Sequence, residues 1–124
     1  MKVLVVDDNP IIRRCLARLL ACRGVASETA GTGDEALACC EREAFAVVIS
    51  DLDMPGMNGV ELAWRLRQRW PEMGLLAFTG SSGDGLRLAA EAVFDRIFEK
   101  SQSTKVVAEG ARLAREISTR VEAI

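Results

Sequence analysis

The stretch VVISDLDMPGMNG, residues 47–59, decides the fold of this chain. Its apolar first part ends at the carboxylate of Asp51, and a loop rich in proline and glycine leads at once to a helix opened by Asn58 or Gly59. Unbroken apolar runs of this length are typical of strands buried on both faces of a parallel sheet. The pattern therefore predicts a strand over 45–50 that presents Asp51 at the mouth of a sheet.

A second apolar strand also ends in acid. Residues 3–6 read VLVV, and Asp7 and Asp8 follow them directly. The chain contains no histidine, so these carboxylates are not accompanied by an imidazole base or ligand. Three carboxylates at strand ends indicate a divalent cation and an aspartyl nucleophile.

The bulk composition is that of one soluble globular domain over residues 1–124, with 49 % hydrophobic and 27 % charged residues. A net charge of −2 gives no sign of the basic surface that nucleic-acid binding requires. The apolar runs fall short of the roughly 20 residues of a membrane span, and the amino terminus lacks a signal-peptide layout. We therefore expect no direct nucleic-acid binding, no membrane insertion and a cytoplasmic location.

Four cysteines, Cys15, Cys22, Cys39 and Cys40, form no CxxC pair and have no histidine to complete a zinc site. The first two share one face of a predicted helix. We interpret all four as small buried apolar residues in a reducing compartment. A redox role for the adjacent pair at 39–40 is the alternative.

Apolar stretches and helical patterns alternate five times along the chain. Strands are predicted at 3–6, 25–30, 45–50, 74–79 and 96–99. Helices are predicted from Pro10 (capped by Asn9) to Gly24, over 34–42, from Asn58 or Gly59 through Trp70, over about 86–93 after a loop at 80–85, and from a cap at Ser103 or Thr104 to about Val121. This order implies an α/β fold with a doubly wound parallel sheet and helices on both faces.

Ligands bind such sheets outside the carboxyl ends of the strands. The polar residues at those ends are Asp7, Asp8, Asp51, Thr79 and Lys100. Clustered carboxylates keep their charge when a cation lies among them, and Mg²⁺ suits oxygen ligands. A carboxylate beside such a metal can attack a phosphoryl group, whose oxygens Lys100 would neutralise and Thr79 would hydrogen-bond. Each residue alone has a plainer interpretation as a turn, cap or solvated residue, so their joint placement carries the prediction.

On these residues the chain resembles the receiver domain of two-component response regulators, from residue 2 to about 121. Residues 3–9 resemble the acidic-pair strand of that family and residues 51–59 its phosphoacceptor segment. Thr79 matches the switch hydroxyl and Lys100 the phosphate-binding lysine. The resemblance implies a flavodoxin-like five-stranded sheet of order 2-1-3-4-5 with five helices.

The resemblance also implies a mechanism. Asp51 would take a phosphoryl group from a phosphohistidine on a sensor histidine kinase or a phosphotransfer protein, and the domain would catalyse only its own phosphorylation and dephosphorylation. Asp8 and Asp51 would hold Mg²⁺ by their side chains, Asp53 by its backbone carbonyl, and Asp7 mainly through water. We expect a single-domain regulator or phosphorelay intermediate that switches protein–protein contacts.

Three positions depart from the family pattern. Ser101 stands where proline usually follows the lysine, Ile97 where an aromatic residue usually lies, and Gly80 where alanine is common. We expect phosphorylation to reorder the loops 80–85 and 100–103, with little rotamer change at Ile97.

Two other functions are compatible with parts of the pattern. The run from Asp51 to Asp53 after an apolar strand resembles the nucleophile motif of haloacid-dehalogenase-type phosphatases, although the acids at 7 and 8 come too early for that family. A pseudo-receiver that works without phosphorylation is the other alternative, and the complete set of acids, Thr79 and Lys100 argues against it.

Overall fold

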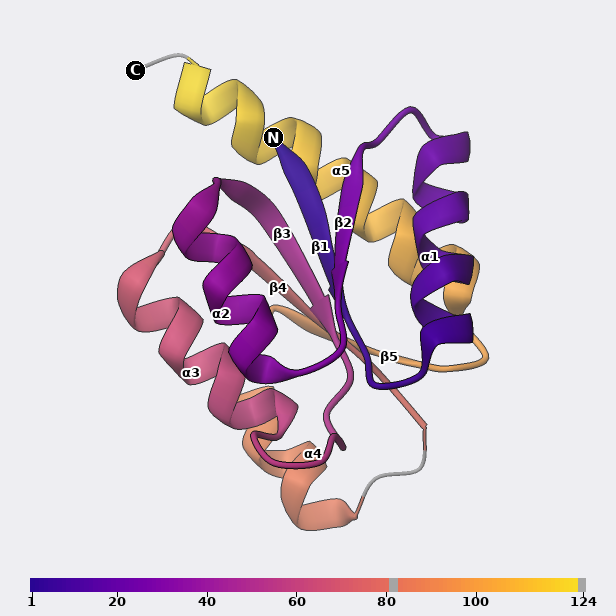
Figure 1. Cartoon of the computed structure of the whole chain (residues 1–124), viewed down its shortest axis with the longest axis vertical. Helices are drawn as coiled ribbons and strands as arrows, with labels where there is room; N and C mark the ends of the chain where they lie inside the picture. Colours follow the sequence, from indigo (N-terminus) through magenta and orange to yellow (C-terminus); the bar gives the residue numbers. More distant parts are fainter. Residues whose placement is uncertain (81–82, 123–124) are drawn as a thin grey trace.

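Strands and helices alternate through the whole structure, and the strands meet in one parallel sheet (Figure 1). The structure is a computed structural model and describes residues 1–80 and 83–122. The strands are β1 (Lys2–Val6), β2 (Ser27–Ala30), β3 (Phe45–Ser50), β4 (Gly74–Thr79) and β5 (Arg96–Glu99). The helices are α1 (Pro10–Cys22), α2 (Gly33–Arg42), α3 (Gly59–Arg69), α4 (Asp84–Glu91) and α5 (Ser103–Glu122).

The sheet has the order β2-β1-β3-β4-β5, as predicted. The central strands β1 and β3 pair in parallel with Val6 opposite Ser50, so their carboxyl ends lie side by side. The ladder continues one residue further, because the amide of Asp51 donates to the carbonyl of Val6 at 2.9 Å. The backbone alone therefore places the acids that follow β1 and β3 next to each other.

Two hydrophobic clusters fill the space between the sheet and its helices. Alternate strand residues point to opposite faces, so Leu4 belongs to the cluster under α2, α3 and α4, whereas Val5 belongs to the one under α1 and α5. Figure 1 shows these two groups of helices on either side of the sheet. All six residues of β3 and all six of β4 are buried, which agrees with their unbroken apolar runs.

Helix boundaries follow the capping residues. The side chains of Asn9, Thr32 and Asn58 accept hydrogen bonds from backbone amides in the first turns of α1, α2 and α3. The chain leaves α1 through Gly24, whose φ of +74° suits glycine. These contacts confirm Asn9 as the cap of α1. Of the two predicted openings of α3, Gly59 is its first residue and Asn58 its cap.

Several predicted boundaries are wrong by a few residues. β2 starts at Ser27 rather than at residue 25, because the amide of Val25 still bonds to the carbonyl of Leu20 at the end of α1. α4 spans Asp84–Glu91 rather than 86–93, so the last part of the predicted loop 80–85 is helix, while residues 81–82 lie outside the described residues. Ser103 is the first residue of α5 and not its cap.

The prediction for the cysteines is correct only in part. Cys40 is buried, Cys39 is half-buried, and Cys15 and Cys22 are exposed. Leu16 and Leu20 take the core-facing positions of α1, which leaves both cysteines of that helix on the solvent side. Burial raises the pKa of the Cys40 thiol to about 12. Within residues 1–80 and 83–122, no helix is long and apolar enough to cross a membrane.

Candidate functional site

Three carboxylates meet where the central strands end. Asp7 follows β1 and is 2 % exposed, Asp51 follows β3 and is 8 % exposed, and Asp8 is exposed. One oxygen of each lies within 4.8 Å of an oxygen of the other two. The predicted gathering of these acids at one edge of the sheet is therefore present in the structure.

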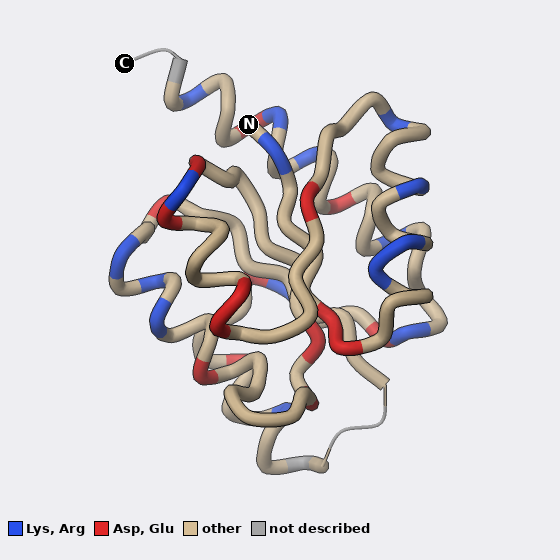
Figure 2. Tube along the Cα trace, viewed as in Figure 1, with Lys and Arg blue, Asp and Glu red and all other residues tan. Residues whose placement is uncertain are grey.

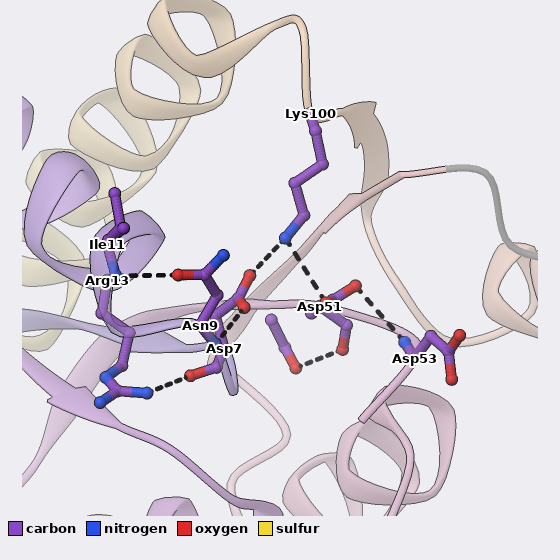
Figure 3. Close-up of polar contacts among 8 residues, drawn as sticks. Asp7, Asn9, Ile11, Arg13, Asp51, Asp53 and Lys100 are labelled. Carbon is purple, nitrogen blue, oxygen red and sulfur yellow. Dashed lines mark hydrogen bonds and ion pairs between the residues drawn. The ribbon is translucent and has the colours of Figure 1, made fainter. Parts of the chain in front are cut away.

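Lys100 reaches into this cluster from the end of β5. Its Nζ contacts Oδ2 of Asp7 and lies 3.4 Å from Oδ2 of Asp51 (Figure 3). Its backbone amide donates to the carbonyl of Thr79 at 2.9 Å, which joins the end of β5 to the end of β4. The sequence predicted the lysine beside Asp51, but not its closer contact with Asp7.

Both carboxylate oxygens of Asp7 are engaged. Oδ1 accepts a hydrogen bond from the amide of Asn9 at 2.9 Å, and Oδ2 meets Lys100. The guanidinium of Arg13 donates to the Asp7 carbonyl at 2.7 Å and so fixes the backbone that also carries Asp8 (Figure 3). Among the described residues, the Asp8 carboxylate makes no hydrogen bond or ion pair.

The loop after Asp51 depends on glycine. A Cβ on Gly59 would lie 2.0 Å from the carbonyl oxygen of Asp51, and the Gly59 amide donates to the Leu52 carbonyl at 2.8 Å. The Ser50 hydroxyl donates to the same Asp51 carbonyl at 2.8 Å. Gly56 turns the loop with φ of +76°. The glycines in the stretch at 47–59 thus let α3 start directly against the peptide of Asp51.

The electrostatics of the cluster are unfavourable without a cation. Burial raises the pKa of the Asp51 carboxyl above its ordinary value, the Lys100 ammonium opposes that rise, and the Asp7 carboxylate adds to it. One ammonium therefore faces three carboxylates, and an additional positive charge at this place would relieve their repulsion.

The other predicted site residues lie around the cluster. Thr79 is buried at the end of β4. The Asp53 side chain is exposed, while its amide points at Oδ1 of Asp51 across 3.4 Å. Arg13 and Ser50 were missed, because nothing in the sequence separates Arg13 from its neighbour Arg14 or marks the hydroxyl of Ser50 as a loop donor.

Two of the residues that depart from the family pattern lie near the cluster, in and beside β5. Ile97 is half-buried and packs against the cluster under α2, α3 and α4, whereas Ser101 is exposed. The turn that contains Ser101 is closed by two hydrogen bonds. The Gln102 amide donates to the Glu99 carbonyl at 2.8 Å, and the Glu99 amide donates to the Gln102 side chain at 3.0 Å.

Comparison with known proteins gives consistent results. The family model described as the response regulator receiver domain matches residues 3–112 of this chain. The transcriptional activator protein ExaE of Pseudomonas putida is 39 % identical over 115 residues, which cover 90 % of this chain and 54 % of ExaE. The sensor histidine kinase RcsC of Salmonella typhimurium is 46 % identical over 68 residues, 55 % of this chain and 7 % of RcsC. The chain thus spans about half of ExaE and a small part of RcsC.

Solved structures show the same architecture. Chemotaxis protein CheY4 of Vibrio cholerae superposes with a TM-score of 0.81 at 30 % identity, covering 90 % of this chain and 97 % of CheY4. A CheY-like receiver domain protein from Methanospirillum hungatei JF-1 superposes with a TM-score of 0.86 at 25 % identity, covering 96 % and 97 %.

Proposed function

Because the chain belongs to the family of response regulator receiver domains, we propose that Asp51 is its phosphoacceptor and that Asp7, Asp8, Thr79 and Lys100 serve this one residue. Receiver domains are signalling domains, generally not enzymes, and histidine kinases phosphorylate them. The observation that carries the assignment is the contact geometry at the edge of the sheet, where one lysine lies between two buried carboxylates.

The proposed reaction transfers a phosphoryl group from a phosphohistidine of a partner kinase or phosphotransfer protein. An oxygen of Asp51 attacks the phosphorus, the P–N bond breaks, and the histidine nitrogen keeps the electron pair and takes up a proton. The nucleophile needs no base because the carboxylate attacks in its ionised form. The product is an acyl phosphate on Asp51.

Lys100 would stabilise the charge on the transferred group. Its Nζ already lies 3.4 Å from Oδ2 of Asp51, so a short movement away from Asp7 brings it to the phosphoryl oxygens. Thr79 would donate its hydroxyl to the same oxygens from the neighbouring strand. The hydrogen bond from the Lys100 amide to the Thr79 carbonyl holds the ends of β5 and β4 together, so a movement of one residue would be felt by the other.

The donor set fits Mg²⁺, because it consists of oxygens only. Asp8 and Asp51 would hold the ion by their side chains and Asp53 by its backbone carbonyl. Asp7 would act mainly through water, which agrees with both of its oxygens already having partners. When bound, the ion would neutralise charge on the phosphoryl oxygens during transfer.

We further propose that the phosphorylated domain signals through changed protein contacts, with reordering of the loops around residues 80 and 100 and little change at Ile97. The family match removes the grounds for the phosphatase alternative. The single-domain organisation over 1–124, the lack of nucleic-acid binding and the cytoplasmic location stay predictions.

The test is phosphorylation by acetyl phosphate with Mg²⁺, followed by intact-protein mass spectrometry. The wild type should gain one phosphoryl group and Asp51→Asn none. Asp53→Asn is the matched control, because it removes a neighbouring carboxylate but keeps the backbone carbonyl and amide, so it should still be labelled. Equal labelling of Asp51→Asn would refute the assignment, and an unlabelled wild type would favour a pseudo-receiver.

A further inference from the structure

Two phenylalanines lie opposite each other on the last two strands. Phe78 of β4 pairs in register with Phe98 of β5, and each is 3 % exposed. Both belong to the hydrophobic cluster under α1 and α5. Each ring also faces a cation. Nζ of Lys100 lies 5.3 Å from the centre of the Phe78 ring, and Cζ of Arg96 lies 4.7 Å from the centre of the Phe98 ring.

The two cations differ in their surroundings. The Arg96 side chain is 60 % exposed and pairs with Glu109 on α5. The Lys100 side chain is 24 % exposed, and its ammonium group contacts the buried Asp7. A cation over an aromatic face gains more when it is desolvated, so the ring of Phe78 matters more to its cation than the ring of Phe98 does.

We propose that Phe78 is a positioning residue that holds the Lys100 ammonium over the acid cluster. This inference rests on the proposed function of Asp51 and Lys100. Lysine has a long flexible stem and gives up rotamer freedom when it is fixed at one place. The ring of Phe78 and the carboxylate of Asp7 both lie against the ammonium at the end of that stem.

The ring of Phe78 can do something that the carboxylate of Asp7 cannot: it can attract the Lys100 ammonium in more than one position. Lys100 must leave Asp7 to reach a phosphoryl group on Asp51, and its ammonium then needs a surface that keeps it inside the site. An aromatic face is neutral and attracts a cation without fixing it in one hydrogen-bond direction. Phe78 therefore lets Lys100 exchange partners without swinging out to solvent.

The contact has a spectroscopic signature. The chain has three lysines, Lys2, Lys100 and Lys105, so their side-chain signals are few enough to separate by NMR. The ε-methylene protons of Lys100 should be shifted upfield by the ring current of Phe78. Phe78→Leu should return them to the positions of the other two lysines. An unshifted Lys100 in the wild type would overturn the proposal.

A matched pair of variants separates positioning from packing. Phe78→Leu and Phe98→Leu remove the same ring from partners of equal burial in one core cluster, so similar losses of thermal stability are expected. Only Phe78→Leu should slow labelling by acetyl phosphate, by roughly three- to tenfold, and Phe78→Tyr should restore both the rate and the Lys100 shift. Equal slowing in both leucine variants would contradict the proposal.

This design keeps the two hypotheses apart. If the wild type is not labelled at Asp51, the proposed function fails, but the ring-current shift still reports on the contact between Phe78 and Lys100. If labelling occurs and Phe78→Leu leaves both the rate and the shift unchanged, only the role of Phe78 is refuted.

Discussion

Charged residues occur in two very different settings in this molecule. On the outer surface, acidic and basic residues are scattered along the helices (Figure 2), and several of them form exposed ion pairs. The ion pair between Arg69 and Glu41 is typical, with side chains 54 % and 55 % exposed. At the edge of the sheet, Lys100 pairs with Asp7 and Asp51, whose side chains are only 3 % and 11 % exposed.

The two settings differ in how charge affects the stability of the fold. Exposed pairs gain little because water screens them, and they can be lost at small cost. Buried carboxylates lose hydration and repel each other, so a cluster of them lowers stability unless partners compensate. We therefore expect the stability of the acid cluster to depend on a bound cation, on pH and on the geometry of the loops that carry it.

The largest effect is expected from the loop that carries Asp51. Gly59→Ala would place a Cβ 2.0 Å from the Asp51 carbonyl oxygen, so the backbone must shift. We expect a loss of about 3 kcal/mol or more in the free energy of unfolding, measured by urea denaturation. Gly85→Ala in α4 is the control, because its Cβ would meet nothing within 4 Å and should stabilise by about 0.5–1 kcal/mol. Similar losses in both variants would show that the close approach at Gly59 is unimportant.

The next effect concerns the metal. Asp8→Asn removes a carboxylate that has no other partner among the described residues, so it should weaken Mg²⁺ binding by roughly tenfold or more in calorimetry. Glu41→Gln removes one negative charge from the exposed pair and should leave the affinity unchanged. If both variants bind Mg²⁺ like the wild type, Asp8 is no ligand.

A smaller effect should appear in the pH dependence of stability. Burial raises the pKa of Asp51, so the native state binds that proton more tightly than the unfolded chain does. The metal-free protein therefore becomes less stable as the pH rises from the ordinary carboxyl range through the raised pKa of Asp51. Asp51→Asn avoids this loss and should be more stable at pH 7, by on the order of 1 kcal/mol.

Thermal unfolding across pH without metal tests this expectation. The advantage of Asp51→Asn should shrink in acid, below the ordinary carboxyl pKa of about 3.9. Saturating Mg²⁺ should reduce the difference at pH 7 by stabilising the wild type. If Asp51→Asn is less stable than the wild type at pH 7 without metal, the expected direction of the stability change is wrong.

The smallest effect is expected at the surface. Arg69→Gln and Glu41→Gln should each change the free energy of unfolding by less than about 0.5 kcal/mol, and a double-mutant cycle should give a coupling energy of similar size. A coupling above about 1 kcal/mol would remove the contrast between the surface pairs and the buried cluster.

Much of the fold could be predicted because local signals agreed with the tertiary structure. β3, β4 and β5 have the predicted bounds. The apolar runs of β3 and β4 each stop at a polar residue at the edge of the sheet, and β5 is a short apolar pair between two charged residues. The start of α4 could not be predicted, because its first residues, Asp84 and Gly85, have low helix propensity and tertiary context overrides it. The exposure of Cys15 and Cys22 was missed because cysteine is usually buried, although the spacing of Leu16 and Leu20 already marks the face of α1 that meets the sheet.

The site was predictable as a set of residues but not as a set of contacts. Strand ends gather at one edge in any parallel sheet, which placed the acids, Thr79 and Lys100 together. Which acid would be buried and which exposed depends on side-chain direction after the strand, so Asp7 and Asp8 could not be distinguished. The contact of Lys100 with Asp7 and with the ring of Phe78 joins residues far apart in sequence, and no local pattern encodes it.

The sheet divides the interior into two hydrophobic clusters that touch different helices. For a protein engineer, the molecule therefore offers two separate repacking problems. Substitutions on the inner faces of α2, α3 and α4 can be chosen without redesigning the layer under α1 and α5. The carboxylates belong to the strand ends between the layers, so the layer under α2, α3 and α4 can be redesigned around a fixed acid cluster. The layer under α1 and α5 contains Phe78, whose ring lies against the Lys100 ammonium, so it offers less freedom.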